Sequence, residues 1–395
     1  MSASLFLLRE PLLDPARKVI AHELRWQAGA QSGEDADSVA LGLLLAAELH
    51  RGDEGWLLAD GKLVLPVGPA FFESAAVQML PGAAFMLTLE EGAAIKPDAL
   101  AAARAAGFHV ALRGLDIDSA LQPLLSGYEL DGAASDLAAQ LKRAMAQRAP
   151  GARIAVRNIA AWKHYDVCAG AGLDVYAGRL IDAPAPAQAA RGLNPSQTVI
   201  LQLMNLVGRN ADVRELEGVL KRDAAISYKL FRYINSVGFG LGAEITSLRH
   251  AVSMLGYSTL YRWLSLLLAT ASTGAHAAAL MQTAIIRGRF TELLGHYLLP
   301  KGDAENLFVA GMFSLLDRLL GIPMEDVLTQ IQLSEALSQA LTKRAGIYGP
   351  FLALAESCER SDGNSQGCAD ALFLSAEQVN AAHLAALAWA QNLKL

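Results

Sequence analysis

Cysteine is scarce in this sequence, which has only Cys168, Cys358 and Cys368 in 395 residues. None of them makes a CxxC pair. A small odd number is typical of a reducing compartment, so we expect free thiols and no disulfide framework. Charge is scarce too, at 18% of residues with a net charge of −6. This balance excludes nucleic-acid binding that depends on bulk positive charge, so we expect no nucleic-acid partner.

Long hydrophobic runs are also missing. The best candidate for a membrane span, residues 39–49, is far shorter than the ~20 residues that a span needs, and Glu48 interrupts it. The N-terminus carries Arg9 and Glu10 and shows neither an apolar run after a basic start nor a small-residue cleavage site. We therefore expect a cytoplasmic protein without a signal peptide or membrane partner.

The first half of the chain alternates between two patterns. Short β-rich runs occur at residues 5–8, 19–26, 62–67, 85–89, 108–112, 153–156 and 173–178. Ala- and Leu-rich stretches with helical spacing lie between them, for example at 98–106 and 134–149. This alternation predicts an α/β fold with a parallel sheet, either open or closed as a barrel. Because a full eightfold barrel typically needs ~250 residues, we expect trimmed or missing elements.

The second half has a different pattern. Residues 181–197 contain three prolines and several alanines, which is typical of a linker. After them the strand signals vanish, and apolar residues recur at helical spacing, as in Leu216, Val219 and Leu220. The sequence thus predicts an α/β domain at 1–182, a linker at 183–195 and an all-helical domain at 196–395.

Three phrases in the helical half carry a family resemblance. RYINS (232–236), ITSLRHAVSMLG (245–256) and YRWLSLLL (261–268) resemble the HDOD domain, a helical relative of the HD phosphohydrolases that generally lacks their metal site. An HD site needs a His followed directly by Asp, and none of the eight histidines is followed by Asp. Ser314 and Leu315 stand where that pair would fall. We therefore expect no metal in this half.

The first half resembles an EAL domain. LREPLLD (8–14) and VIAHELRW (19–26) resemble its start, and IIRGRFTELLG (285–295) resembles a subgroup in which a degenerate EAL domain precedes an HDOD domain. Membership of this EAL–HDOD signal-transduction family implies an EAL-type (β/α) TIM-like barrel followed by a helical domain. EAL domains that hydrolyse cyclic di-GMP hold two divalent cations with carboxylates and an Asn at strand ends.

Few of these ligands are kept in the present sequence. The signature Glu corresponds to Glu23, and an acidic ligand could be Glu90 or Glu91. Asp131 also matches a family Asp. At the other family positions the residue differs: Pro66 replaces the ligand Asn, Arg113 and Gly114 replace the two Asp, and Glu129 replaces the Lys. Arg157 or Ala160 replaces the Glu that activates water in the family, and Ala177 replaces the Gln. The resemblance therefore implies that the catalytic set is lost, and we expect no catalytic residue, metal or cofactor.

Two hypotheses for function follow. The first is a non-catalytic signalling or scaffold protein that acts through protein–protein contacts, with unknown partners or further copies of itself. The second is a metal-independent receptor for cyclic di-GMP or another nucleotide, because guanidinium groups suit phosphate. Its candidate ligand-binding residues are Glu23 and three arginines near predicted strand ends, Arg113, Arg157 and Arg179. Alternatively, these arginines pair with Glu90, Glu91, Glu129 and Asp131, and Glu23 pairs with Arg25 or Arg113. An active phosphodiesterase would need ligands that the sequence does not show.

Candidate partner-binding residues in the helical half are Asn235, Ser236 and Trp263. Each also has a structural explanation. Asn235 and Ser236 could end a helix before the glycine-rich stretch at 238–242, and Trp263 follows the helical period of a packed residue.

Overall fold

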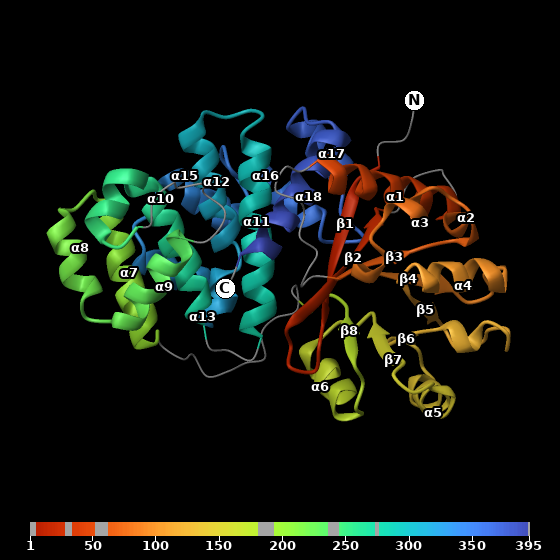
Figure 1. Ribbon diagram of the computed structural model, residues 1–395. Coiled ribbons are helices and arrows are strands. Elements are labelled where there is room, and N and C mark those ends of the chain that lie inside the picture. Colours follow the sequence, from red (N-terminus) through yellow and green to blue (C-terminus); the bar gives the residue numbers. More distant parts are fainter. Residues whose placement is uncertain are drawn as a thin grey trace. The chain divides into compact units, whose positions relative to one another are not determined.

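A computed structural model describes residues 5–27, 34–51, 62–180, 193–235, 245–272 and 276–393. The chain forms two compact units (Figure 1). One consists of Met1–Pro186 with Cys358–Gly363, and the other of Ala187–Ser357 with Asn364–Leu395. Most of the predicted linker, up to residue 192, lies outside the described residues, as does the glycine-rich stretch at 238–242.

The described residues of the first unit form a closed eight-stranded barrel in sequence order. β1 pairs antiparallel with β2 and β8, and every other neighbouring pair is parallel. The strands are β1 (Leu7–Leu13), β2 (Val19–Trp26), β3 (Lys62–Pro66), β4 (Phe85–Glu90), β5 (His109–Arg113), β6 (Gly127–Asp131), β7 (Arg153–Arg157) and β8 (Val175–Ala177).

Short connections let the barrel close within about 180 residues, so of the expected trimmed or missing elements the structure shows trimmed ones and keeps all eight strands. The helices and turns are α1 (Glu34–Arg51), α2 (Pro69–Phe72), α3 (Ala76–Met79), η1 (Gly82–Ala84), α4 (Pro97–Ala105), η2 (Gln122–Leu124), α5 (Leu137–Gln147) and α6 (Trp162–Gly170). Trimming thus affects the helices: only the short η2 turn lies between β5 and β6. Helices α4, α5 and α6 lie outside the strands (Figure 1).

Apolar side chains fill the barrel interior. Leu12, Ala21, Val64, Val175 and Ala177 form a buried cluster contributed by β1, β2, β3 and β8. Filling of this kind makes a small barrel a packed core with no pore, so polar chemistry is confined to the strand ends.

The second unit is helical throughout its described residues. Its helices are α7 (Pro195–Gly208), α8 (Val213–Leu220), α9 (Ala224–Ile234), α10 (Leu248–Thr270), α11 (Ala277–Gly295), α12 (Lys301–Phe313), α13 (Leu316–Leu320), α14 (Met324–Gln330), α15 (Glu335–Lys343), α16 (Gly349–Ser357), α17 (Ser365–Ala371) and α18 (Ala376–Asn392). The start of α7 is set by a capping box between Asn194 and Gln197, with Pro195 at the first helical position.

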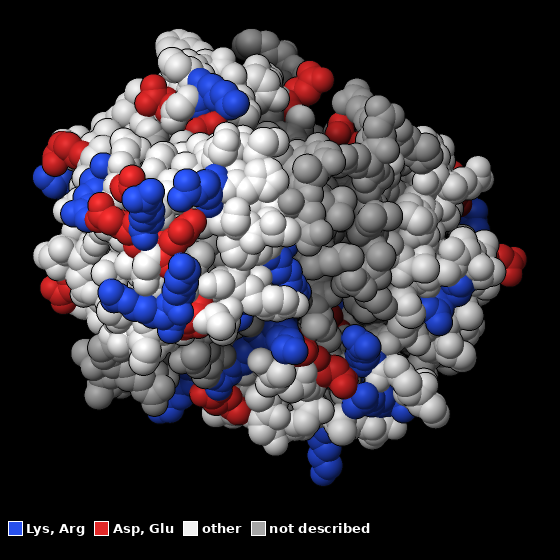
Figure 2. Space-filling view, turned by 60° about the vertical axis from the view of Figure 1, so that its left-hand side comes forward, with Lys and Arg blue, Asp and Glu red and all other residues white. Residues whose placement is uncertain are grey.

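No helix among the described residues is long and apolar enough to cross a membrane. The described part of the face in Figure 2 carries uncharged areas between mixed clusters of basic and acidic groups. This distribution agrees with a composition in which only 18% of residues are charged.

Two glycines set the close approach of α11 and α12, which pack along each other. A Cβ atom on Gly311 would lie 2.6 Å from the Cα of Gly288 and 2.7 Å from the carbonyl oxygen of Arg287. These are backbone atoms that cannot rotate away, so the two helices would have to separate to accept a larger residue at 311.

We expect Gly311→Ala to destabilise the helical unit by about 1–3 kcal/mol, because overpacking forces backbone shifts. Gly302→Ala is the matched control in the same helix, since a Cβ there meets nothing within 4 Å. The control should leave stability unchanged or raise it slightly. Denaturant unfolding of both variants measures the difference, and equal stabilities would contradict the close-approach argument.

Candidate functional site

The carboxyl ends of the barrel strands gather polar side chains at one level. Strand pairing sets Glu90 of β4 beside Arg113 of β5, and Arg113 beside Glu129 of β6. On the other side of the barrel, Glu10 of β1 is paired with Glu23 of β2. Because alternate residues of a strand share a face, these five side chains reach the same mouth of the barrel.

Arg113 binds three carboxylates from three different strands. Its Nη2 donates to Oε2 of Glu23, its Nε donates to Oε2 of Glu129, and its Nη1 donates to Oε1 of Glu90 at 3.2 Å. Arg25 lies on the other side of Glu23, with its Nε 3.5 Å from Oε1. The guanidinium of Arg113 thus stands at the centre of an acidic group of side chains.

Burial strengthens these interactions. The exposed fractions of the Arg113, Glu23 and Glu129 side chains are 9%, 8% and 3%. Burial raises the pKa of Glu23 to about 7, against the opposing effect of Arg113 and with further increases from Glu129 and Glu10. Burial alone would lower the pKa of Arg113, but the carboxylates of Glu129 and Glu23 outweigh it and raise that pKa. Arg113 therefore stays charged at every relevant pH.

The residues present do not fit the pair of divalent cations that the EAL resemblance implies. A fixed positive charge already occupies the centre of the carboxylates, and Pro66 and Ala177 have no ligand atom in their side chains. Gly114 has a φ of +122°, and a Cβ there would lie 1.9 Å from Oε2 of Glu91, so an aspartate would be strained at this position. Within the described ranges, no group of three or more His, Cys, Asp or Glu could hold a metal ion.

Arg157 lies near the same acidic group, since burial raises the pKa of Glu10 and Arg25, Arg113 and Arg157 all oppose that rise. Arg157 is paired with Asp131 in the β6–β7 register, and its buried Nε has no hydrogen-bond partner in the structure. Asp131 itself accepts from the Ala133 amide and from Nδ2 of Asn158, both at 2.9 Å. Arg179 donates to Asp362, which belongs to the segment that groups with the barrel. The structure therefore brings Glu23 and Arg113 into contact and sets Arg157 near Glu10 in the same barrel mouth, whereas Arg179 pairs with Asp362.

A second buried arginine site lies in the helical unit, where the HD pair would fall. Nη1 of Arg287 donates to Oγ of Ser314 at 2.7 Å and to Oε1 of Glu356 at 3.1 Å. Arg344 holds the same carboxylate from the other side, at 2.8 Å. Burial would raise the pKa of Glu356, but Arg287 and Arg344 outweigh it and lower that pKa. The sequence gives no indication of this cluster, because the spacing of apolar residues does not show which charged side chains pair.

The candidate partner-binding residues divide into three cases. Asn235 ends α9 and is hydrogen-bonded to Ile245 in both directions, each at 2.8 Å. Trp263 is only 3% exposed and forms part of the packed face of α10. Ser236 lies outside the described residues. Asn235 thus connects the end of α9 to the residue before α10, and Trp263 is too buried to contact a partner.

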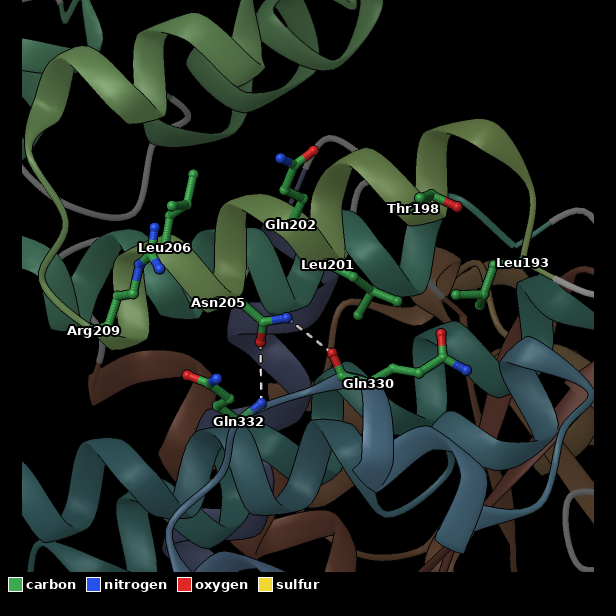
Figure 3. Close-up of a pocket in the computed structure, with 9 residues that line it drawn as sticks. All are labelled: Leu193, Thr198, Leu201, Gln202, Asn205, Leu206, Arg209, Gln330 and Gln332. Carbon is green, nitrogen blue, oxygen red and sulfur yellow. Dashed lines mark hydrogen bonds between the residues drawn. The ribbon is translucent and has the colours of Figure 1, made fainter.

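A cavity of about 500 Å³ lies between α7 and residues 330–332 (Figure 3). Asn205 spans it by donating to the Gln330 carbonyl at 2.9 Å and accepting from the Gln332 amide at 3.0 Å. The other lining residues are Leu193, Thr198, Leu201, Gln202, Leu206 and Arg209. The only charged group, Arg209, pairs with Glu215 at 3.1 Å, so this neutral lining does not favour an anionic nucleotide.

The barrel mouth predicts a pH dependence of stability. Because the pKa of Glu23 rises from 4.5 to about 7 on folding, the folded protein keeps a proton that the unfolded chain releases. The free energy of unfolding should therefore fall as pH rises between those two values. Glu23→Gln cannot ionise and should reduce this slope in denaturant unfolding. Glu73→Gln, in an exposed pair with Lys96, should keep the wild-type slope. An unchanged slope in Glu23→Gln would contradict the assignment.

Comparison with known proteins gives one family match. The HDOD domain family matches residues 193–340. The cyclic di-GMP phosphodiesterase CdgJ of Vibrio cholerae serotype O1 is 30% identical over 206 residues, which cover 51% of this chain and 48% of that protein. The chain thus spans about half the length of this relative. The uncharacterized protein YuxH of Bacillus subtilis is 22% identical over 411 residues, or 98% of each chain.

Solved structures of EAL proteins resemble part of the chain. The PaMucR phosphodiesterase in complex with c-di-GMP has a TM-score of 0.38 and 20% identity, covering 47% of this chain and 98% of that chain. The FimX EAL domain of Xanthomonas citri in complex with c-diGMP has a TM-score of 0.36 and 15% identity, covering 46% and 88%. The chain consists of a closed eight-stranded barrel followed by a helical unit, of which residues 193–340 match the HDOD domain family.

Proposed function

We propose that this chain is a non-catalytic signalling protein that acts through protein–protein contacts. Its similarity to a cyclic di-GMP phosphodiesterase over about half of each chain, together with its match to the HDOD domain family, supports a role in signalling. The observation that carries the proposal is the guanidinium of Arg113, which bridges Glu23, Glu129 and Glu90 in the barrel mouth.

Hydrolysis of a phosphodiester by two metal ions needs ligands that place the ions and lower the pKa of a bound water. Arg113 repels cations from the carboxylates that would bind them. Arg157 and Ala160, which stand where the resemblance places a water-activating Glu, cannot accept a proton from water at neutral pH. A fold that keeps its core but loses these groups can still serve as a binding surface.

Metal-free binding of cyclic di-GMP finds less support. Such a receptor would need guanidinium groups free to meet phosphate, but the N–H groups of Arg113 point at three carboxylates and Arg179 is paired with Asp362. Displacing a buried carboxylate from Arg113 would leave that carboxylate unpaired, which costs about 3–5 kcal/mol. Of the three candidate arginines, only Arg157 has no ion pair with another described residue.

The test is an assay for cyclic di-GMP hydrolysis with Mg²⁺ or Mn²⁺, together with calorimetric titration of the nucleotide in EDTA. We expect no linear product above the rate without protein and no binding heat, because the barrel mouth is closed by its own ion pairs. The titration should give the same result for wild type and Arg157→Gln.

Two outcomes would contradict the proposal. Metal-dependent hydrolysis that Glu23→Gln abolishes would make the chain an active phosphodiesterase. Saturable binding in EDTA that Arg157→Gln weakens, while the exposed control variant Lys163→Gln does not, would make it a metal-free receptor instead.

A further inference from the structure

A short segment from the second half of the sequence belongs to the barrel unit. The chain leaves the helical unit after Ser357, at the end of α16, and returns to it at Asn364, just before α17. The six residues between them, 358–363, group with the barrel and are called the strap below. Because the strap is continuous with α16 and α17, the residues that join it to both helices must accommodate any change in its position.

The two ends of the strap are held close together. The side-chain hydroxyl groups of Ser357 and Ser365 are hydrogen-bonded at 2.9 Å, and both residues are buried. Within the strap, the Gly363 amide donates to the Arg360 carbonyl at 3.0 Å. A compact loop whose ends meet is typical of Ω-loops, which frequently carry function. The strap is thus a closed loop with a fixed base.

The strap covers an open edge of β1. β8 has only three residues and pairs with Leu12 and Leu13, at the end of β1. Near the start of β1, the Arg9 amide instead donates to the Cys358 carbonyl at 3.1 Å. The Arg9 side chain, which is only 2% exposed, donates to Glu359 at 3.0 Å. The strap therefore supplies backbone and side-chain partners that β8 is too short to provide.

Two further contacts hold the strap at the same end of the barrel. Nε2 of Gln27, which follows β2, donates to the Arg360 carbonyl at 3.0 Å. Arg179, which follows β8, donates to the carboxylate of Asp362. Because β1 runs antiparallel to β2 and β8, its first residues lie at the same end of the barrel as the last residues of those strands. The strap thus contacts three strands at the level of the barrel mouth.

The strap can leave β1 without unfolding the barrel. Of its six residues, only Cys358 is buried, and the others are half-buried or exposed. The side chains of Arg179 and Asp362 are 49% and 54% exposed, and exposed ion pairs contribute little stability. A segment with few buried apolar contacts opens at a lower free energy than the core around it. The strap therefore has two states, docked on β1 and released from it.

The strap also connects two ion-pair clusters along the chain. Arg9 is followed by Glu10, which faces the barrel mouth and accepts from Arg25 at 3.4 Å, because neighbouring side chains of a strand face opposite sides. At the other end, Cys358 comes two residues after Glu356, whose carboxylate two arginines share. A shift of β1 at the barrel mouth therefore reaches Glu356 through the strap.

We propose that the strap is a conformational coupling element, through which a change at the barrel mouth alters α16 and α17. Such coupling requires one element with two states that both sites bias, and the docked and released strap meets this requirement. The inference goes beyond the proposed function, since it holds whether or not the barrel mouth binds a nucleotide. It gives a signalling protein a route from the barrel to the helices.

The test changes the barrel mouth and measures the helices. Arg25→Gln removes the guanidinium that binds Glu10, and hydrogen exchange of the full chain, followed by mass spectrometry, reports on α16 and α17. Relative to the amides of α7 and α8, we expect those of α16 and α17 to exchange about threefold faster or more than in wild type. If Arg25→Gln does not fold, Glu10→Gln removes the other partner of the same pair and serves in its place.

A second background shows whether the strap carries the effect. Glu359→Lys with Asp362→Lys places like charges beside Arg9 and Arg179, so the strap should be released and its own amides should exchange faster. In this background, adding Arg25→Gln should leave the exchange of α16 and α17 unchanged. Asp166→Asn is the control, because Asp166 is an exposed partner of Arg17 in the turn at the opposite end of β1 and β2. It should leave both helices at the wild-type rate.

Three results would overturn the proposal. They are unchanged exchange of α16 and α17 in Arg25→Gln, an equal change in Asp166→Asn, and an effect of Arg25→Gln that persists after the strap is released. None of them depends on hydrolysis or on nucleotide binding. A failure here is therefore distinguishable from a failure of the proposed function, which only those two assays would reveal.

Discussion

A buried guanidinium needs anionic hydrogen-bond partners to replace the water it has lost. In the barrel mouth this requirement applies to Arg113. Removing a charge from water costs several kcal/mol, which only close and well-directed partners offset. Glu23 and Glu129 supply those partners from inside the barrel, and Glu90 does so from its rim. The contacts that stabilise the arginine also occupy the carboxylate oxygens that a metal ion would need.

The helical unit repeats the arrangement. Arg287 and Arg344 share the carboxylate of Glu356, and Ser314 stands where a metal-binding pair would be expected. In both units, an arginine that belongs to the chain supplies a fixed cation near the position where the family resemblance would place a metal site. Such a cation stabilises buried acids without offering an open coordination position.

The sequence was sufficient to predict an α/β unit followed by a helical unit, and the position of Arg113 at the end of β5. Both depend on local features, namely the spacing of apolar residues and the point at which a strand ends. The alternative in which Arg113 pairs with acids of neighbouring strands is the one that the structure shows. Sequence reasoning missed β6 as a β-rich run, since Glu129 and Asp131 interrupt its apolar pattern by facing the barrel mouth. It also could not find the pairing of Arg287 with Glu356, which lie 69 positions apart. Contacts of this range are set by tertiary packing alone.

The most direct test of the central claim is a titration of the wild-type chain with Mn²⁺, followed by the electron paramagnetic resonance signal of the free ion. If Arg113 already occupies the centre of the carboxylates of the barrel mouth, the protein should leave the free-ion signal unchanged at neutral pH, with or without cyclic di-GMP. Uptake of Mn²⁺ that disappears in Glu23→Gln would show that the carboxylates still accept a metal ion, and would contradict the account.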